Sequence, residues 1–171
     1  MNAATQPGGG SGVTPATLSE PAFEVVAVRD TFAATAGWPA EPGSVQLEAD
    51  GTAAVFHYAP GRWLVIGTAG VAARMEAASQ AGDCTVVDVT GKWQALRAHG
   101  AESAARLASA ANVDELLRGR GCAAAMLFGC PVILVREAAG VQVLIPRSYR
   151  DAFHYAYEQV RITPASGRSQ S

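Results

Sequence analysis

The part of the chain that decides its fold opens with Asp88-Val-Thr-Gly-Lys-Trp-Gln-Ala-Leu-Arg-Ala-His-Gly100 and closes with Val143-Leu-Ile-Pro-Arg-Ser-Tyr149. The first run is a turn followed by a strand over 93–98, which ends before a glycine. The second is an apolar strand that leads through Arg-Ser into a helix. A helix rich in small residues and two apolar strands around Pro131 lie between them in the sequence. This order of elements is specific, yet it displays almost no chemistry of its own.

Short apolar runs and alternating patterns predict further strands along the chain. Asp50-Gly51 between two such runs is a typical hairpin turn signal. The stretch 31–43 contains several glycines and prolines, which is typical of a loop. The predicted strands are 23–30, 45–48, 54–58, 63–66, 85–89, 93–98, 122–128, 132–135 and 141–145.

Helices are predicted where apolar residues recur at spacings of three and four. These segments are 70–81, 102–111 and the stretch that starts at Ser148. Ser148 is a good N-cap residue, and Asp151 stands three residues later, as in a capping box. The last helix has one apolar face, made of Tyr149, Ala152, Phe153, Ala156, Tyr157 and Val160.

Together these elements predict an α+β fold, in which helices pack on one face of a mainly antiparallel sheet. The chain has 171 residues, which is enough for one domain with a real core. We place that single domain at 20–162. Residues 1–18 are rich in Gly, Pro, Ser, Thr and Ala, so we expect a disordered N-terminal arm there. The tail over 163–171 is similar in composition, and we expect it to be disordered too.

Charge and hydropathy argue against several classes of partner. The formal net charge is −2 and the signs are interspersed, so nothing attracts nucleic acid or anionic lipid. No apolar run reaches the roughly 18 residues of a membrane-spanning helix. The first residues have no basic start and no apolar core, so we expect no signal peptide and a cytoplasmic protein. Because only 16% of the residues are charged, apolar contact with another protein is the favoured mode of interaction.

The sequence shows no constellation of catalytic or metal-binding residues. His57, His99 and His154 have no neighbouring ligand at a spacing that suits a metal, which favours structural roles. There is no Gly-x-Ser-x-Gly nucleophile motif and no glycine loop with phosphate-binding spacing.

The cysteines and tryptophans also favour structural roles. Cys84, Cys122 and Cys130 are an odd number and sit among apolar residues, which predicts buried thiols rather than a disulfide or a metal site. Trp63 and Trp93 are expected to anchor the core or an interface.

Two polar residues beside apolar strands are candidates for function. Asp88 is either a functional acid with a raised pKa or an acceptor of backbone hydrogen bonds at a turn with Thr90. We favour the second interpretation. Arg147 either binds an anion or a partner's carboxylate, or it is solvated or paired locally, and the sequence leaves both open.

Two sets of motifs carry a resemblance to known families. Asp88-Val-Thr followed by Leu96-Arg-Ala-His-Gly-Ala-Glu-Ser-Ala-Ala-Arg-Leu107 resembles the opening motif of the aminomethyltransferase (glycine-cleavage T-protein) folate-binding fold. Two later runs resemble, more specifically, the gamma subunit of heterotetrameric sarcosine oxidase. They are Gly121-Cys-Ala-Ala-Ala-Met-Leu-Phe-Gly-Cys-Pro-Val-Ile-Leu-Val-Arg136 and Val143-Leu-Ile-Pro-Arg-Ser-Tyr-Arg-Asp-Ala-Phe153. The resemblance covers about residues 60–160, and the residues before it match no motif of that family.

This resemblance implies a small, non-catalytic gamma subunit. Such subunits assemble with an alpha subunit that binds FAD, NAD and tetrahydrofolate, a beta subunit that carries covalent FMN, and a delta subunit that carries zinc. The complex would oxidise sarcosine to glycine with formation of hydrogen peroxide, and would pass the one-carbon unit to tetrahydrofolate. We therefore assign no catalytic, cofactor-binding or metal-binding residue to this chain, and we expect alpha, beta and delta subunits as its partners.

The sequence alone leaves other functions open. The same gamma type occurs in related amine dehydrogenases such as N-methylglutamate dehydrogenase. An independent folate-binding protein of one-carbon transfer would use Asp88 as the carboxylate that holds the pterin. A stand-alone module that binds or senses a small molecule is the third possibility.

Overall fold

Two five-stranded antiparallel sheets make up the strand content of the computed structural model, which describes residues 13–17, 21–28, 32–47, 53–67, 69–82 and 84–161. The strand order is β1-β7-β10-β9-β8 in the first sheet and β3-β4-β5-β2-β6 in the second. The strands are β1 (Val13–Thr17), β2 (Ala22–Ala27), β3 (Val45–Leu47), β4 (Ala53–Ala59), β5 (Arg62–Gly67), β6 (Cys84–Asp88), β7 (Trp93–His99), β8 (Cys122–Leu127), β9 (Cys130–Glu137) and β10 (Gly140–Pro146). The helices are α1 (Phe32–Ala36), α2 (Ala69–Gln80), α3 (Gly100–Ala108), α4 (Val113–Leu116), the 3₁₀ turn η1 (Arg147–Tyr149) and α5 (Arg150–Gln159).

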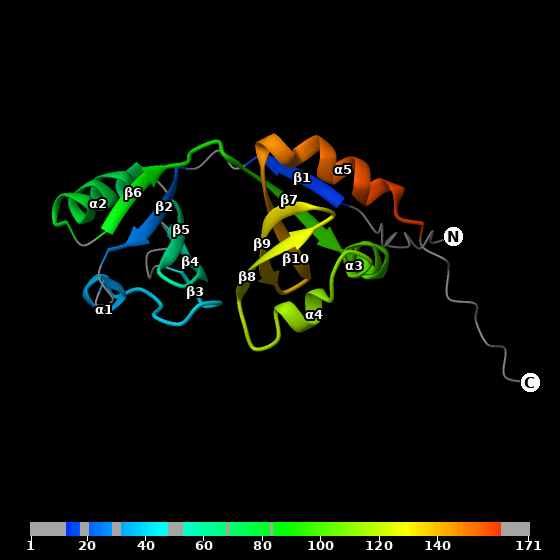
Figure 1. Cartoon of the computed structure of the whole chain (residues 1–171), viewed down its shortest axis with the longest axis horizontal. Coiled ribbons are helices and arrows are strands. Elements are labelled where there is room, and N and C mark those ends of the chain that lie inside the picture. Colours follow the sequence, from blue (N-terminus) through cyan, green and yellow to red (C-terminus); the bar gives the residue numbers. More distant parts are fainter. Residues whose placement is uncertain are drawn as a thin grey trace, which may run out of the picture.

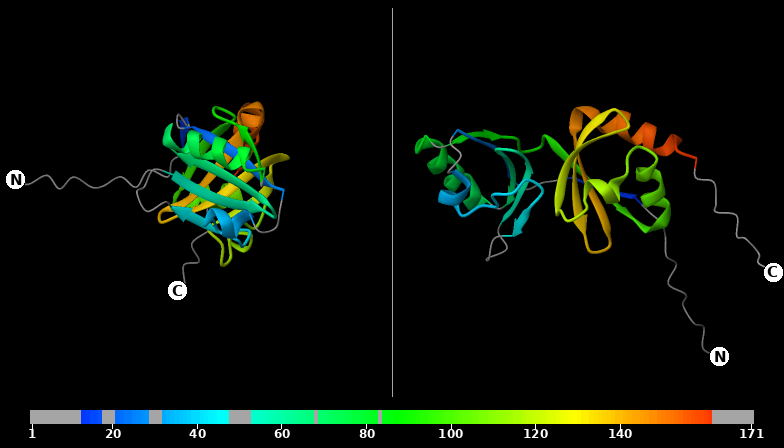
Figure 2. Two further views of the ribbon diagram at one scale, coloured as in Figure 1. Left: turned by 90° about the vertical axis from the view of Figure 1, so that its left-hand side faces the viewer. Right: turned by 60° about the horizontal axis from the view of Figure 1, so that its bottom comes forward.

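Helices cover one face of each sheet, and the other faces of the two sheets are turned toward each other (Figure 1). α1 and α2 lie against the second sheet, whereas α3, α4 and α5 lie against the first (Figures 1 and 2). The expected α+β class, with helices on one face of an antiparallel sheet, is therefore confirmed. The division of the strands into two sheets was not part of that prediction.

Three apolar clusters hold the layers together. One fills the space between the first sheet and its helices and includes Leu107, Leu117, Phe153 and Tyr157. A second lies between the second sheet and its helices and includes Phe32, Val55, Trp63 and Met75. The third joins the inner faces of the two sheets through Phe56, Leu64, Trp93, Ile133 and Leu144.

Strand β5 shows how a continuous apolar run supplies two of these clusters. Successive side chains of a strand point to opposite faces of the sheet. Trp63 and Val65 therefore face the helices, and Leu64 and Ile66 face the other sheet. A strand buried on both faces needs apolar residues at every position, which explains why Trp63–Ile66 shows no polar alternation.

Strand β1 corrects the prediction of a disordered arm over 1–18. Residues 13–17 pair with β7, from Val13 opposite Ala98 to Thr17 opposite Gln94. Ladder hydrogen bonds use the backbone, so a run of small and polar residues can complete a sheet edge without an apolar pattern of its own. Pro15 is compatible with this place because β1 is an edge strand. The rest of the predicted arm and the predicted tail over 163–171 lie outside the described residues.

The predicted loop over 31–43 contains helix α1, which is a second correction. Phe32 and Ala33 are buried, and the ring of Phe32 meets those of Trp38 and Trp63 edge-on at centroid distances of 5.3 and 5.5 Å. The indole of Trp63 also donates a hydrogen bond to the carbonyl of Pro39 at 3.0 Å. These tertiary contacts stabilise one helical turn that the neighbouring glycine and prolines did not predict.

Ser148 does not cap the final helix. It lies inside the 3₁₀ turn η1, the residue before α5 is Tyr149, and no side chain caps that end of the helix. Asp151 accepts a hydrogen bond from the guanidinium of Arg150 at 2.7 Å instead of completing a capping box. The predicted apolar face is partly confirmed, since Phe153 and Tyr157 are buried but Tyr149 remains 41% exposed.

Candidate functional site

Asp88 is the last residue of β6 and stands at the start of the turn that carries the chain from the second sheet to the first. Its carboxylate accepts a hydrogen bond from the backbone N–H of Thr90 at 2.8 Å. The hydroxyl of Thr90 accepts from the N–H of Ala22 at 3.1 Å, and Val89 N–H donates to the Ala22 carbonyl at 2.8 Å. Hydrogen bonding to Thr90 lowers the pKa of Asp88, which is fully exposed. The interpretation of Asp88 as an acceptor of a backbone hydrogen bond is confirmed, and the direction of its pKa shift is opposite to the raised pKa that the alternative interpretation requires.

Of the three histidines, His57 is the one the structure buries. Its imidazole stacks on the indole of Trp63 at a centroid distance of 4.4 Å, and it is 2% exposed. Burial lowers the pKa of His57, although the backbone carbonyls of Pro39, Glu41 and Ala59 oppose this shift. His57 is therefore packed in the core, which agrees with the structural role that the sequence favoured.

The stability of the chain is expected to fall as the pH drops below the ordinary histidine pKa of 6.5. Because folding lowers the pKa of His57, the unfolded chain takes up a proton first, so stability is complete above that pH and is lost below it. His57→Phe keeps the stacking on Trp63 and should flatten this dependence. Urea unfolding at about pH 7.5 and pH 5 measures it. The partly buried His154 offers a control, because His154→Gln should leave the dependence in place; an unchanged dependence in His57→Phe would contradict the assignment.

The three cysteines are buried and none forms a disulfide. The thiol of Cys122 lies 3.5 Å from the carbonyl of Ser44, and burial raises its pKa to about 11. Burial also raises the pKa of Cys130. These shifts disfavour the thiolate, so neither thiol has the character of a nucleophile. The predicted buried thiols are confirmed.

Arg147 is exposed and lies beside the turn between β6 and β7. Its guanidinium donates a hydrogen bond to the carbonyl of Gly91 at 3.4 Å, and its backbone N–H donates to the carbonyl of Lys92 at 2.7 Å. These contacts tie the start of η1 to the turn that carries Asp88. They give Arg147 a local structural role, and within the described part of the chain no carboxylate is paired with it.

A groove of 660 Å³ lies between the inner faces of the two sheets, and we call it the inter-sheet groove. The first sheet contributes an apolar wall that includes Ala124, Met126 and Pro131. The second sheet contributes a polar wall made of Glu24, Tyr58 and Arg62, with Lys92 beside it. Met126 is 59% exposed at its rim, which is unusual for a large apolar side chain. Sequence reasoning missed this groove.

Glu24 is the centre of the polar wall. It accepts a hydrogen bond from the Tyr58 hydroxyl at 2.5 Å and one from the Lys92 ammonium at 3.0 Å, and Arg62 lies 3.7 Å away. Burial by itself raises the pKa of Glu24, but the hydrogen bonds and the two cations outweigh it and lower the pKa. Burial and the bond to Glu24 raise the pKa of Tyr58. Because Lys92 and Tyr58 are far from Glu24 in the sequence, no local motif predicted this cluster.

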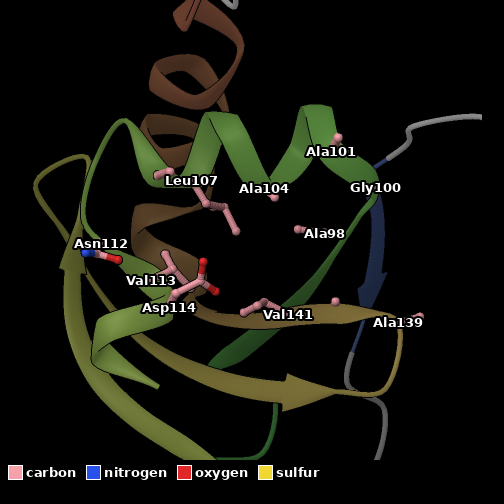
Figure 3. Close-up of a pocket in the computed structure, with 12 residues that line it drawn as sticks. Ala98, Gly100, Ala101, Ala104, Leu107, Asn112, Val113, Asp114, Ala139 and Val141 are labelled. Carbon is pink, nitrogen blue, oxygen red and sulfur yellow. The ribbon is translucent and has the colours of Figure 1, made fainter. Parts of the chain in front are cut away.

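A second cavity, of 320 Å³, lies between α3, α4 and the turn from β9 to β10 (Figure 3). Its walls are mainly small apolar residues, among them Ala98, Ala104 and Val141. Among the described residues, Asp114 is the one carboxylate that lines this cavity. The side-chain oxygen of Asn112 already accepts a hydrogen bond from the N–H of Glu115. The cavity has few polar groups that could orient a ligand.

Asp88 and the three histidines line neither cavity. Within the described ranges, no three His, Cys, Asp or Glu side chains come close enough together to hold a metal ion. None of the helices formed by those residues is long and apolar enough to span a bilayer. The most distinctive feature that remains is the inter-sheet groove, whose exposed apolar wall suits contact with another molecule.

Comparison with known proteins shows a clear likeness in structure but none in sequence. No family model and no curated protein matches the sequence. The structure is similar to a chain of the heterotetrameric sarcosine oxidase from Corynebacterium sp. U-96 in complex with pyrrole 2-carboxylate, with a TM-score of 0.70, 18% identity, and coverage of 91% of this chain and 90% of that chain. A weaker match is the regulatory subunit of aspartate kinase from Thermus thermophilus, with a TM-score of 0.36, 11% identity and coverage of 86% and 95%. The first match establishes that the chain has a fold like that of a sarcosine oxidase subunit.

Proposed function

We propose that this chain is the non-catalytic gamma subunit of a heterotetrameric sarcosine-oxidase-like complex. The observation that carries the proposal is the likeness to a chain of such an enzyme over nearly the full length of both chains. Mutual coverage of this kind means that the two chains are nearly equal in length. A short chain is what the gamma type requires, and the motifs over residues 60–160 that resemble the gamma subunit support the same assignment.

In this proposal the chemistry belongs to the partner subunits. The alpha subunit would bind FAD, NAD and tetrahydrofolate, the beta subunit would carry FMN, and the delta subunit would complete a cytoplasmic complex that oxidises sarcosine. The buried histidine, the buried thiols and the exposed Asp88 of this chain all have structural explanations. These explanations support the proposed scaffolding role, in which the chain supports an active site built by its partners.

The alternative of an independent folate-binding protein is less well supported. It needs a pocket in which a carboxylate faces the pterin, and Asp88 was the candidate. Asp88 is exposed, is bonded to Thr90 and lines neither cavity. A gamma subunit of a related amine dehydrogenase, such as N-methylglutamate dehydrogenase, has the same fold requirement and differs in the substrate that its partners accept.

Co-expression of this chain with the alpha, beta and delta subunits of a heterotetrameric sarcosine oxidase tests the proposal. The tagged chain should co-purify with flavin absorbance, and the complex should form hydrogen peroxide when sarcosine is added. Replacing sarcosine by N-methylglutamate, with an artificial electron acceptor in place of oxygen, separates the oxidase from the dehydrogenase. A monomeric chain that binds tetrahydrofolate and retains no flavoprotein would contradict the proposal.

Asp88→Ala is expected to lower the melting temperature of the chain by a few degrees while turnover of the assembled complex stays unchanged, because the carboxylate fixes a turn. Folding lowers the pKa of Asp88, so its contribution is present above the ordinary value of 3.8 and is lost as the pH falls below it. Thermal melts at neutral and acidic pH, beside sarcosine-dependent peroxide formation, measure both effects. A normal melting temperature with abolished turnover would show that Asp88 has a catalytic role instead.

A further inference from the structure

Strand β8 borders the inter-sheet groove and is an edge strand of the first sheet. Its sequence, Cys-Ala-Ala-Ala-Met-Leu, carries no charge and no proline. Edge strands normally carry charged residues, proline or a cover, because their free backbone groups invite pairing with another chain. An apolar, uncharged edge next to an exposed groove is therefore a feature that needs an explanation.

The register of the β8–β9 hairpin shows which backbone groups are free. Phe128 and Gly129 have φ values of 52° and 75°, which is typical of a two-residue type I′ turn closed by Leu127 and Cys130. The residues that close such a turn form a hydrogen-bonded pair, here Leu127 with Cys130. From that pair along an antiparallel ladder, non-hydrogen-bonded and hydrogen-bonded positions alternate. Residues 122, 124 and 126 therefore direct their N–H and C=O groups outward, away from β9.

The outward backbone groups of β8 form a hydrogen bond at the start of the strand, and those further along the strand form none among the described residues. The N–H of Cys122 donates to the carbonyl of Gly43 at 3.0 Å, which covers the edge there. Ala124 and Met126 are the next outward residues, and both are exposed. No hydrogen bond among the described residues uses their outward backbone groups. The free part of the edge thus begins where the groove opens.

The charges of the groove define what its occupant carries. Two cations, Arg62 and Lys92, surround one carboxylate, Glu24, so the polar wall holds a surplus positive charge. The side chain of Arg62 is 55% exposed and lies 3.7 Å from Glu24, which leaves its guanidinium available to a second anion. A carboxylate on the occupant would complete this cluster. The facing wall, with Met126 and Pro131, suits an apolar side chain.

We propose that an extended segment of a partner subunit adds to the free edge of β8 as a further strand. Its backbone pairs with Ala124 and Met126, one of its apolar side chains enters the inter-sheet groove, and one of its carboxylates pairs with Arg62. This mode of recognition takes affinity from main-chain hydrogen bonds and specificity from the pockets beside the edge. The inference rests on the proposed function, because it takes the partner to be another subunit of the complex.

Ala124→Pro, with Ala124→Ser as its matched control, tests the backbone contact. Proline removes the outward N–H and leaves the β8–β9 ladder intact, because Ala124 opposes Ile133 at a non-hydrogen-bonded position. Serine keeps the N–H. With the co-purified flavoprotein subunits as the probe, we expect Ala124→Pro to weaken binding at least tenfold and Ala124→Ser to leave it unchanged. Equal binding by the proline variant, with the same melting temperature as the wild type, would overturn the inference.

Two further measurements do not depend on how the proline variant folds. In the wild-type chain, hydrogen exchange at the amides of Ala124 and Met126 should slow at least tenfold in the complex. Arg62→Gln should reduce the salt dependence of binding, whereas Arg62→Lys should preserve it. Unchanged exchange at both amides would overturn the inference while the proposed function stands.

The same experiments separate the failure of the two proposals. A wild-type chain that binds none of the flavoprotein subunits would overturn the proposed function together with this inference. A wild-type chain that dimerises alone and becomes monomeric with Ala124→Pro would assign the β8 edge to a second copy of the chain. That result would overturn the inference of a different partner subunit.

Discussion

Phe153→Ala is expected to lower the free energy of unfolding by about 3–5 kcal/mol, which is the usual cost of removing a buried phenylalanine. Phe153 is fully buried and is the largest of the side chains with no exposure. Its ring meets that of Phe128 edge-on at 5.4 Å and stacks on that of Tyr157 at 6.2 Å. The substitution therefore leaves a cavity at the place where α5 and the β8–β9 hairpin meet.

The loss should be large because α5 has few other attachments. Tyr157 is the second buried residue of the helix, and the guanidinium of Arg106 donates to the carbonyls of Tyr157 and Glu158 at 3.1 and 3.2 Å. A domain of this kind is usually stable by about 5–15 kcal/mol, so the variant would lose a large part of its stability. Urea unfolding gives the midpoint and the slope from which the change is obtained.

Tyr155→Ala provides the control on the same helix. Tyr155 is 69% exposed, so its removal should change the free energy of unfolding by less than about 0.5 kcal/mol. Equal losses in the two variants would show that helix propensity, and not the packing of Phe153, holds α5 in place. We also propose that the predicted domain over 20–162 unfolds as one unit together with strand β1, which pairs with β7, since one apolar cluster joins both sheets. A single transition seen by two probes would test this.

The sequence predicted most of the elements because their signals are local. Turn residues and apolar runs located the β3–β4 pair and the strands β8 and β9, and the spacing of apolar residues located the final helix; the observed positions differ by a few residues at most. The structural interpretation of Asp88 also came from a local pattern, an acidic residue two positions before a threonine in a turn. Such patterns involve residues that are close together in the sequence, so one sequence is enough to recognise them.

What the sequence did not predict depends on contacts between distant residues. Strand β1 exists because β7 offers a partner, and α1 exists because Trp38 and Trp63 cover it. The division into two sheets follows from which strands pair, and a run such as Trp63–Ile66, apolar at every position, does not reveal its neighbours. The polar wall of the groove joins Glu24 to Lys92, 68 positions later. No periodicity connects positions so far apart.

Gly140→Ala is the other substitution with a large expected effect, because Gly140 has both an unusual backbone conformation and no room for a side chain. Its φ is 158°, in a region that other residues rarely adopt. A Cβ atom at this position would lie 2.2 Å from the carbonyl oxygen of Ala98, which belongs to the adjacent strand β7. The backbone of β10 would have to move away from β7 where Gly140 pairs with His99.

The expected loss is about 2–6 kcal/mol, the sum of roughly 1–3 kcal/mol for backbone strain and roughly 1–3 kcal/mol for overpacking. Gly119→Ala is the matched control, since Gly119 has a φ of 67° and nothing within 4 Å of a Cβ atom. Gly119→Ala should lower the free energy of unfolding only by the strain of a residue in the left-handed backbone conformation, about 1–2 kcal/mol. Chemical unfolding of both variants compares them directly. Equal losses would mean that conformational strain alone sets the requirement for glycine at 140, whereas a larger loss at Gly140 would show that the close approach of β10 to β7 sets it.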